Sequence, residues 1–124
     1  MTLLLDTHAF LWWRLDSRKL KRAARESIAA ADIVFVSAAS VWEITIKQAL
    51  GRITVAEPLP AMIHASEFTP LSITVEHAER VGLLPPHHAD PFDRMLVAQA
   101  LVEGATIVSH DDQLGPYGVP MIWT

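Results

Sequence analysis

Short apolar segments that alternate with helical patterns constrain the fold of this chain more than any other feature of its sequence. Residues 3–5 (LLL) form an apolar run that stops at Asp6, and residues 33–36 (IVFV) form a second run rich in β-branched side chains. Both patterns are typical of buried strands. Further strands are predicted at residues 70–73, 105–108 and 121–123. Since strands that alternate with helices usually pair in parallel, we expect a mostly parallel sheet covered by helices on both faces.

The segments between these strands carry helix start and stop signals. Ser17, Thr74 and Asp90 are suited to cap helices, because their side-chain oxygens can accept hydrogen bonds from the first backbone N–H groups. Gly51 and Gly104 are suited to end helices. Helices are therefore predicted at residues 7–15, 18–30, 38–50, 61–67, 75–83 and 91–104, with Ser37 or Ala38 opening the third and Pro91 in the first turn of the last.

The composition is that of a single folded domain spanning residues 1–124. Hydrophobic residues make up 51% of the chain and charged residues 19%, which allows a buried core and excludes a disordered chain. Because there is no cysteine, the chain cannot form disulfides, zinc-thiolate sites or thiol nucleophiles, and this fits a reducing cytoplasm. A soluble cytoplasmic protein is expected, since the N-terminus has no basic leader and no apolar run could cross a membrane.

The charge of the chain gives a mixed indication about nucleic acid. A formal net charge of −4 by itself argues against RNA or DNA binding, which normally calls for excess positive charge. Five of the ten basic residues nevertheless lie between Arg18 and Arg25 and could follow an RNA backbone. A solvated helix face is the alternative interpretation of this basic cluster, which consists of Arg18, Lys19, Lys21, Arg22 and Arg25.

Acidic residues lie where the predicted strands end. Asp6 directly follows the first strand and Asp111 follows the fourth by two residues. Asp93 falls in the first turn of an apolar helix, and Glu43 lies near the apolar face of the helix that follows the second strand. Each has an ordinary alternative role: Asp6 and Asp111 as helix caps, Asp93 as a helix-dipole contact, and Glu43 as the partner of Lys47.

Together the four carboxylates indicate a metal site. Ligands of parallel sheets bind beyond the carboxyl ends of the strands, so these side chains are expected to converge there. Four carboxylates at one place would repel one another strongly unless a cation were present. Oxygen ligands without cysteine favour Mg²⁺, with Mn²⁺ as a substitute, and such a site suits phosphodiester hydrolysis.

The acidic residues lie in four stretches that span nearly the whole chain: residues 3–8 (LLLDTH), 37–44 (SAASVWEI), 88–100 (HADPFDRMLVAQA) and 107–111 (IVSHD). In this order they resemble the PIN-domain ribonucleases and, within them, the VapC toxins of bacterial toxin–antitoxin pairs. The resemblance implies a single three-layer α/β/α domain with a parallel sheet of four to five strands in the order 3-2-1-4-5. It also implies a metal-dependent endoribonuclease that inhibits translation and growth.

The resemblance assigns roles to individual residues. Asp6, Glu43 and Asp93 match the family's core metal-binding carboxylates, and Asp111 matches its more variable fourth acidic position. Thr7 and Ser37 match polar positions that often line the pocket. Asp90 is expected to cap its helix or to support the metal ligands without binding the metal itself. Asp112 replaces Asp111 as the fourth ligand if Asp111 points away from the site.

The resemblance also implies partners. Members of the family are commonly neutralised by an antitoxin, encoded just upstream, whose C-terminal segment crosses the active site, often with a basic side chain. A homodimer or a toxin–antitoxin hetero-oligomer is therefore expected. The segment 10–13 (FLWW) could supply the antitoxin groove, and one of Trp12 and Trp13 is expected near the surface because adjacent helical residues cannot face the same side.

Two other functions fit parts of the sequence. A zinc or iron hydrolase could use ligands from His87, His88, Asp90 and His110, although adjacent histidines diverge in most backbone conformations. A binding module without enzyme activity would keep its acidic residues only as helix caps.

Overall fold

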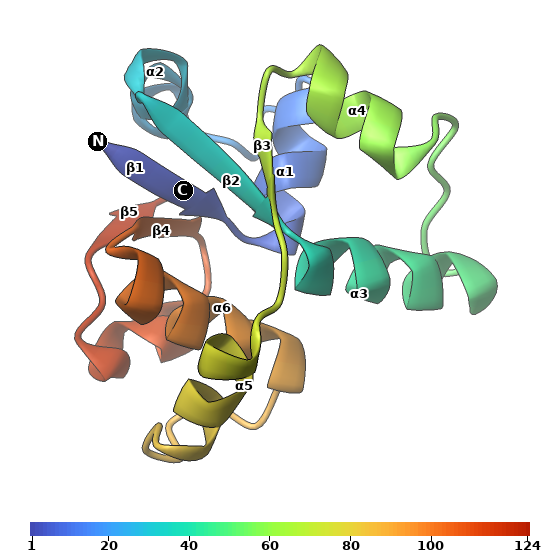
Figure 1. Cartoon of the computed structure of the whole chain (residues 1–124). Helices are drawn as coiled ribbons and strands as arrows, with labels where there is room; N and C mark the ends of the chain where they lie inside the picture. The colour runs from blue at the N-terminus through green and yellow to red at the C-terminus, as the bar shows by residue number, and fades with distance from the viewer.

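The computed structural model describes residues 1–124 and contains one five-stranded parallel sheet between two layers of helices (Figure 1). The sheet order is β3-β2-β1-β4-β5, and every neighbouring pair is parallel. The predicted strand order and three-layer architecture are thereby confirmed. The strands are β1 (Thr2–Leu5), β2 (Ile33–Ser37), β3 (Thr69–Leu71), β4 (Thr106–Ser109) and β5 (Met121–Trp123).

The strands of the sheet bury both faces because successive side chains point to opposite sides. Leu3 and Leu5 of β1 pack into the core beneath α1 (Thr7–Arg14), α2 (Arg22–Ala30) and α4 (Leu59–Ala65). Leu4 packs into the second core, beneath α6 (Pro91–Glu103) and a 3₁₀ helix, η1 (Asp112–Tyr117). A strand buried on both sides has no polar face, which explains the continuous LLL run.

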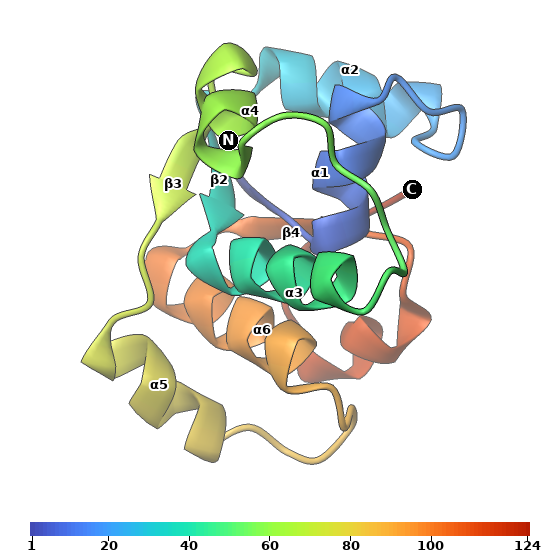
Figure 2. The same ribbon diagram turned by 90° about the vertical axis from the view of Figure 1, so that its right-hand side faces the viewer.

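Two further helices complete the architecture. The helix α3 (Ala38–Ala49) leaves the carboxyl edge of the sheet and runs beside α6, with the start of α1 next to it (Figure 2). The short helix α5 (Val75–Gly82) packs on α6 through His77, which is 1% exposed and contacts Glu103 at 2.9 Å. None of the helices has the length and apolar character needed to span a membrane.

Most predicted helix caps are confirmed. Asp6, Ser37, Thr74 and Asp90 each accept a hydrogen bond from a backbone N–H of the first turn of the following helix. Gly104 ends α6 in the left-handed conformation (φ +67°) that glycine tolerates best.

The predicted cap at Ser17 is wrong. The helix α2 begins only at Arg22, and the hydroxyl of Ser17 accepts a hydrogen bond from the backbone of Lys19 instead. The chain turns between these residues because Leu20 is buried in the core, with 2% of its surface exposed. A regular helix from Ser17 would not allow this turn. Burial of Leu20 therefore outweighs the local preference of Ser17 for a helix cap.

Other element boundaries differ only slightly from the prediction. The strand β3 is limited to three residues and pairs with β2 alone, and this edge position tolerates Pro70. The 3₁₀ helix η1 was not predicted. It contains Gly115 and Pro116, which are typical of turns rather than of helices.

The parallel arrangement brings the carboxyl ends of β1, β2 and β4 to one edge of the sheet. Asp6 follows β1, Ser37 ends β2 and Ser109 ends β4. Since β1 lies between β2 and β4, Asp6 stands at the centre of this edge.

Replacing Phe10 by alanine should lower the free energy of unfolding by about 3–5 kcal/mol, because this fully buried ring fills the core between α1 and the sheet. The matched substitution Leu15→Ala, at a side chain that is 70% exposed, should change it by less than about 0.5 kcal/mol. Urea denaturation followed by circular dichroism measures both values. Equal losses in the two variants would contradict this description of the core.

Candidate active site

A polar cavity of about 210 Å³ opens at the carboxyl edge of the sheet. None of the residues around it is hydrophobic. All four carboxylates predicted as metal ligands line this cavity, so residues from four separate stretches of the chain do converge. The full lining consists of Asp6, Thr7, His8, Glu43, Lys47, His88, Asp90, Asp93, His110 and Asp111.

Asp6 is fixed in this cavity by two hydrogen bonds. One carboxylate oxygen accepts from the backbone N–H of Ala9 at 2.8 Å, and the other accepts from the hydroxyl of Ser109 at 2.6 Å. The side chain is only 4% exposed, and this burial raises its pKa despite both hydrogen bonds. Asp6 therefore caps α1 and lines the cavity at the same time.

Glu43 is held from two sides. Its Oε1 accepts a hydrogen bond from the hydroxyl of Thr7 at 2.6 Å, and its Oε2 lies 2.9 Å from Nζ of Lys47. The expected pair between Glu43 and Lys47 thus exists, but it lies within the cavity rather than on a solvated surface. Thr7, predicted as a pocket residue, acts here by orienting Glu43.

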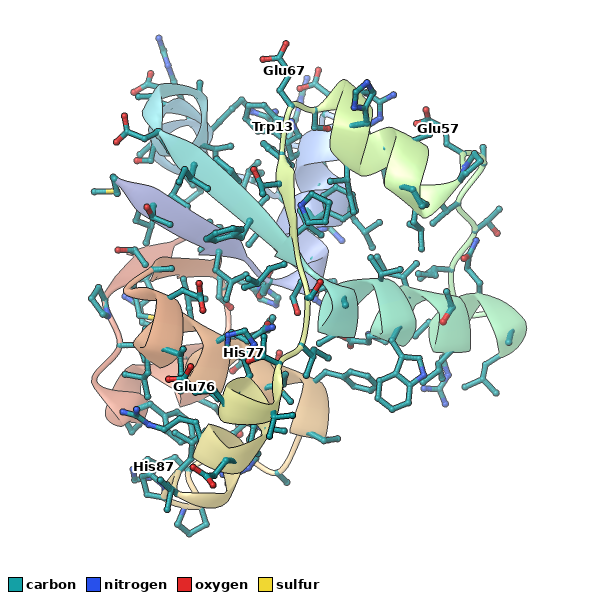
Figure 3. All side chains as sticks on the ribbon, in the orientation of Figure 1. Trp13, Glu57, Glu67, Glu76, His77 and His87 are labelled. Carbon is teal, nitrogen blue, oxygen red and sulfur yellow. The ribbon has the colours of Figure 1, made fainter.

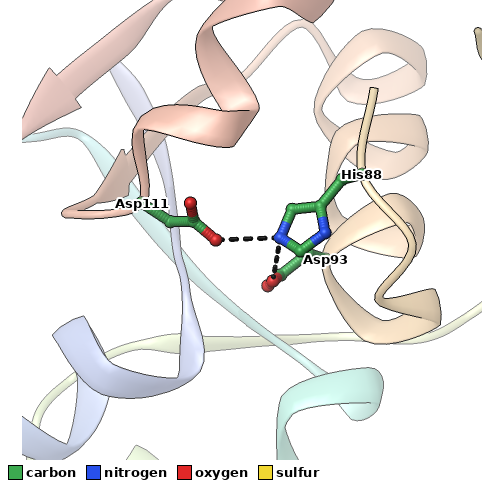
Figure 4. Close-up of side chains that lie close together, drawn as sticks. All are labelled: His88, Asp93 and Asp111. Carbon is green, nitrogen blue, oxygen red and sulfur yellow. Dashed lines mark hydrogen bonds and ion pairs between the residues drawn. The ribbon is translucent and has the colours of Figure 1, made fainter. Parts of the chain in front are cut away.

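His88 connects Asp93 with Asp111 (Figure 4). Its Nε2 lies 2.9 Å from Oδ2 of Asp111 and 3.2 Å from Oδ2 of Asp93. The Nδ1 atom accepts a hydrogen bond from the backbone N–H of Asp90 at 3.2 Å. Because Nδ1 accepts this hydrogen bond, Nε2 is the ring nitrogen placed to donate to the carboxylates.

Burial and neighbouring negative charges raise the pKa of Asp93 to about 7. The charges responsible are those of Asp90, Asp6 and Glu43, and His88 only partly offsets them. Burial also acts to raise the pKa of Asp111, but the hydrogen bonds from His88 and from the backbone of Gln113, together with the nearby histidines, outweigh it and lower the pKa. Without a cation, this site at neutral pH therefore retains protons that isolated aspartates would lose.

The donor set fits a hard divalent cation. Each of the four carboxylates offers oxygen atoms, and an oxygen that accepts one hydrogen bond keeps a second lone pair. The only lysine or arginine in the lining is Lys47, which leaves a large excess of negative charge. Mg²⁺ and Mn²⁺ prefer such oxygen ligands, and Asp6, Glu43, Asp93 and Asp111 are the residues that would hold the ion.

Three other predicted residues occupy different positions. Asp90 caps α6 through the backbone N–H groups of Phe92 and Asp93 and also borders the cavity. Ser37 is fully buried, caps α3 and does not line the cavity. Asp112 is exposed at the start of η1, outside the cavity, so Asp111 is the fourth carboxylate.

Sequence reasoning missed three residues of the site: Ser109, Lys47 and His8. Ser109 could have been found from its position at the end of β4, which neighbours β1 in the sheet. Lys47 was considered only as a surface partner of Glu43. His8 follows Asp6 by two residues and lines the cavity; its side chain is exposed to solvent, but partial desolvation by the atoms around it lowers its pKa.

Of the four residues of the alternative zinc or iron site, all but His87 lie at the cavity, and His88 has a ligand atom within 4.8 Å of those of Asp93 and Asp111. His87 packs against Tyr117 with ring centroids 5.0 Å apart, beside the loop after α5 (Figure 3). It is absent from the lining of the cavity, whereas His88, Asp90 and His110 border it. The predicted zinc or iron set therefore loses one of its ligands.

The basic cluster lies outside the cavity. None of its five residues belongs to the lining. Arg22 pairs with Glu26 at 3.0 Å and Arg25 with Asp16 at 3.2 Å, so part of its charge is neutralised locally. This arrangement favours a solvated helix face over a track for RNA.

Comparison with known proteins gives one family. The family model of the PIN domain matches residues 3–118. The chain is 31% identical over 122 residues to Ribonuclease VapC22 of Mycobacterium tuberculosis, covering 96% of this chain and 94% of the relative.

Solved structures share the fold at low sequence identity. VapBC2 from Rickettsia felis, bound to a DNA fragment from its promoter, contains a chain that matches with a TM-score of 0.72 at 12% identity, covering 98% of each chain. DNA-bound VapBC from Salmonella typhimurium matches with a TM-score of 0.64 at 12% identity, covering 98% of this chain and 97% of the other.

The metal-free protein should lose stability as the pH rises. Asp93 has a pKa of about 7 in the folded chain against an ordinary value of 3.8, so folding favours its protonated form. Its contribution to stability is complete below about pH 4 and declines up to pH 7, by at most about 1.4 kcal/mol per pH unit. Urea denaturation in a chelator at pH 5, 6, 7 and 8 measures this slope.

The variant Asp93→Asn should flatten this pH dependence, since asparagine does not titrate in this range. The exposed Asp112→Asn is the matched control and should keep the wild-type slope. Identical slopes in wild type and Asp93→Asn would show that Asp93 is not the group responsible.

Proposed function

The chain belongs to the PIN domain family, and from this premise we propose that it is a metal-dependent endoribonuclease and the toxin of a toxin–antitoxin pair. The observation that carries the proposal is the convergence of Asp6, Glu43, Asp93 and Asp111 on one cavity at the carboxyl edge of the sheet. The relative of 31% identity is named a ribonuclease, which supports RNA as the substrate class. Cytoplasmic RNA would be the target, and growth would stop through loss of translation.

The chemistry of the proposed reaction is hydrolysis of a phosphodiester bond. A bound Mg²⁺ or Mn²⁺ would supply activation of water and neutralisation of charge on the phosphate. The protein itself contributes orientation: Ser109 and the N–H of Ala9 fix Asp6, and Thr7 and Lys47 fix Glu43. These bonds fix the orientation of Asp6 and Glu43 beside Asp93 and Asp111, whose ligand atoms already lie within 4.8 Å of one another and of His88.

An antitoxin segment has a fitting surface next to this cavity. An apolar groove of about 370 Å³ runs between α1 and the loop before α4, and its lining includes Leu11, Trp12, Ile53 and Val55. His8 borders both the groove and the acidic cavity, so the two are continuous. A peptide with apolar side chains in the groove could therefore place a basic side chain in the cavity.

Only part of the predicted segment 10–13 supplies this groove. Leu11 and Trp12 line it, whereas Phe10 is fully buried and Trp13 packs against Phe68 with ring centroids 5.6 Å apart. We also infer a homodimer or hetero-oligomer, since α3 and the residue that caps its C-terminus expose large apolar side chains at positions 42, 46 and 50.

Asp6→Asn should lower the rate of RNA cleavage by at least about 100-fold, because it removes a charged ligand from the centre of the site. Asp93→Asn should do the same, and a strong chelator should abolish the activity of the wild type. Ser109→Ala, which only releases Asp6, should lose about 10- to 100-fold. Cleavage of total cellular RNA, followed by sequencing of the cut ends, measures each rate and names the target.

Growth of induced cells provides a second measurement, since wild type should arrest growth and Asp6→Asn should not. Asp112→Asn is the matched control, because this exposed aspartate lies outside the cavity. Activity that survives Asp6→Asn but is lost in His88→Ala would instead support a zinc or iron hydrolase. RNA binding that is indifferent to Mg²⁺, without cleavage by any variant, would support the binding module.

Val55→Asp should weaken binding of the antitoxin by at least about 10-fold, because it places a charge in the apolar groove. RNA cleavage should remain near the wild-type rate, since Val55 does not line the acidic cavity. Val75→Asp makes the same change at a residue that is 87% exposed on α5 and should affect neither property. Calorimetric titration with the polypeptide encoded directly upstream measures the affinities, and equal affinities for the two variants would contradict the groove assignment.

A further inference from the structure

Three aromatic rings meet at the rim of the acidic cavity. His8 and Trp12 come from successive turns of α1, and His110 comes from the loop after β4. Their ring centroids lie 5.7 Å (His8–Trp12), 5.3 Å (His8–His110) and 5.0 Å (Trp12–His110) apart. This group, the aromatic corner, is not part of the proposed metal site.

The aromatic corner combines a fixed ring with two accessible ones. Trp12 is half-buried and packs against the main core, so its position is determined by the fold. His8 and His110 are exposed to solvent. Exposed rings that rest on an anchored tryptophan lose little conformational freedom when a ligand binds to them.

The sequence ties the corner closely to the carboxylates. His8 follows Asp6 by two residues, His110 directly precedes Asp111, and both histidines line the acidic cavity. A phosphate placed in the cavity would therefore bring a neighbouring base close to the three rings.

Electrostatics alone gives little affinity for RNA at this site. Lys47 is the one lysine or arginine of the lining, and it already contacts Glu43 at 2.9 Å. Proteins that recognise single-stranded RNA commonly stack its bases on histidine, tryptophan or other aromatic side chains, an interaction that needs no positive charge.

We propose that His8, Trp12 and His110 form a stacking site for one unpaired base next to the scissile phosphate, an inference that rests on the ribonuclease function proposed above. The rings are inclined to one another by 38° to 83°, so a base can lie flat on only one of them while its edges meet the others. The corner therefore holds a single splayed base rather than a stacked run. This restricts the substrate to single-stranded or looped RNA.

His110 distinguishes this site from the antitoxin groove. His8 lines both the acidic cavity and the apolar groove and Trp12 lines the groove, whereas His110 lines the acidic cavity alone. Substitutions of His110 should therefore affect RNA more than an antitoxin segment. Because His110 is exposed, they should also leave the fold intact.

The test uses the whole protein and short single-stranded RNAs that contain its own cleavage sequence. In each RNA one nucleotide beside the cut is intact or abasic, and kcat/KM is measured for both. Removal of the stacked base should lower kcat/KM of the wild type about 5- to 150-fold. His110→Phe keeps a ring, so its kcat/KM should still fall strongly when the base is removed. In His110→Leu, removal of the base should change kcat/KM little. Trp12→Phe and Trp12→Leu form a second pair with the same expectation.

The outcomes separate this inference from the function on which it rests. If the wild type cuts no RNA with Mg²⁺ or Mn²⁺, the ribonuclease proposal itself fails. If the wild type cuts RNA but the abasic loss is equal in the phenylalanine and leucine variants, the stacking site is overturned and the ribonuclease stands. Weaker antitoxin binding by His110→Leu with an unchanged abasic loss would equally overturn it, by assigning the corner to the antitoxin.

Discussion

Repulsion among buried carboxylates is the constraint around which this molecule is arranged. Asp6, Glu43 and Asp93 lie close enough for each of the first two to raise the pKa of the third, and burial removes the water that would screen them. The fold holds these groups mainly with neutral donors: a backbone N–H and a serine for Asp6, and a threonine for Glu43. Neutral donors orient a carboxylate without cancelling its charge. The site therefore keeps an excess of acidic groups, whose remaining protons a divalent cation would displace on binding.

The parallel topology of the sheet helps to stabilise these negative charges. In a parallel sheet covered by helices, the helices that follow strands begin at the carboxyl edge, where their N-terminal N–H groups and positive dipole ends favour negative charge. Asp6 caps α1, Asp90 caps α6 and Asp111 caps η1, and all three line the same cavity. Capping and ligand binding are thus compatible roles of one carboxylate, since each role uses a different lone pair. The sequence alone offered helix capping and metal binding as alternatives for these aspartates, but the geometry allows both at once.

The sequence predicts those parts of the site that depend on local signals and misses those that depend on which strands are neighbours. The strand ends and caps are local signals, so Asp6, Asp90 and Asp93 could be placed correctly from their neighbours along the chain. The bond between Ser109 and Asp6 joins residues 103 positions apart and depends on β4 lying beside β1. That order came only from the family resemblance, because alternation of strands and helices does not fix which strands are neighbours. The Ser17 cap failed for a related reason, since burial of Leu20 is a tertiary effect that outweighs a local preference.

The same charge excess bears on the two macromolecules proposed to bind here. A phosphate is repelled by the cavity until a divalent cation is bound, whereas a basic side chain of an antitoxin is attracted by the empty carboxylates directly. Both would occupy the neighbourhood of His8, where the acidic cavity and the apolar groove meet. Under the proposed function, antitoxin and cation-bound substrate would exclude one another, because the basic side chain and the cation would neutralise the same carboxylates. Inhibition by the proposed antitoxin would then require no change in the fold, only a basic side chain on a peptide that fits the groove.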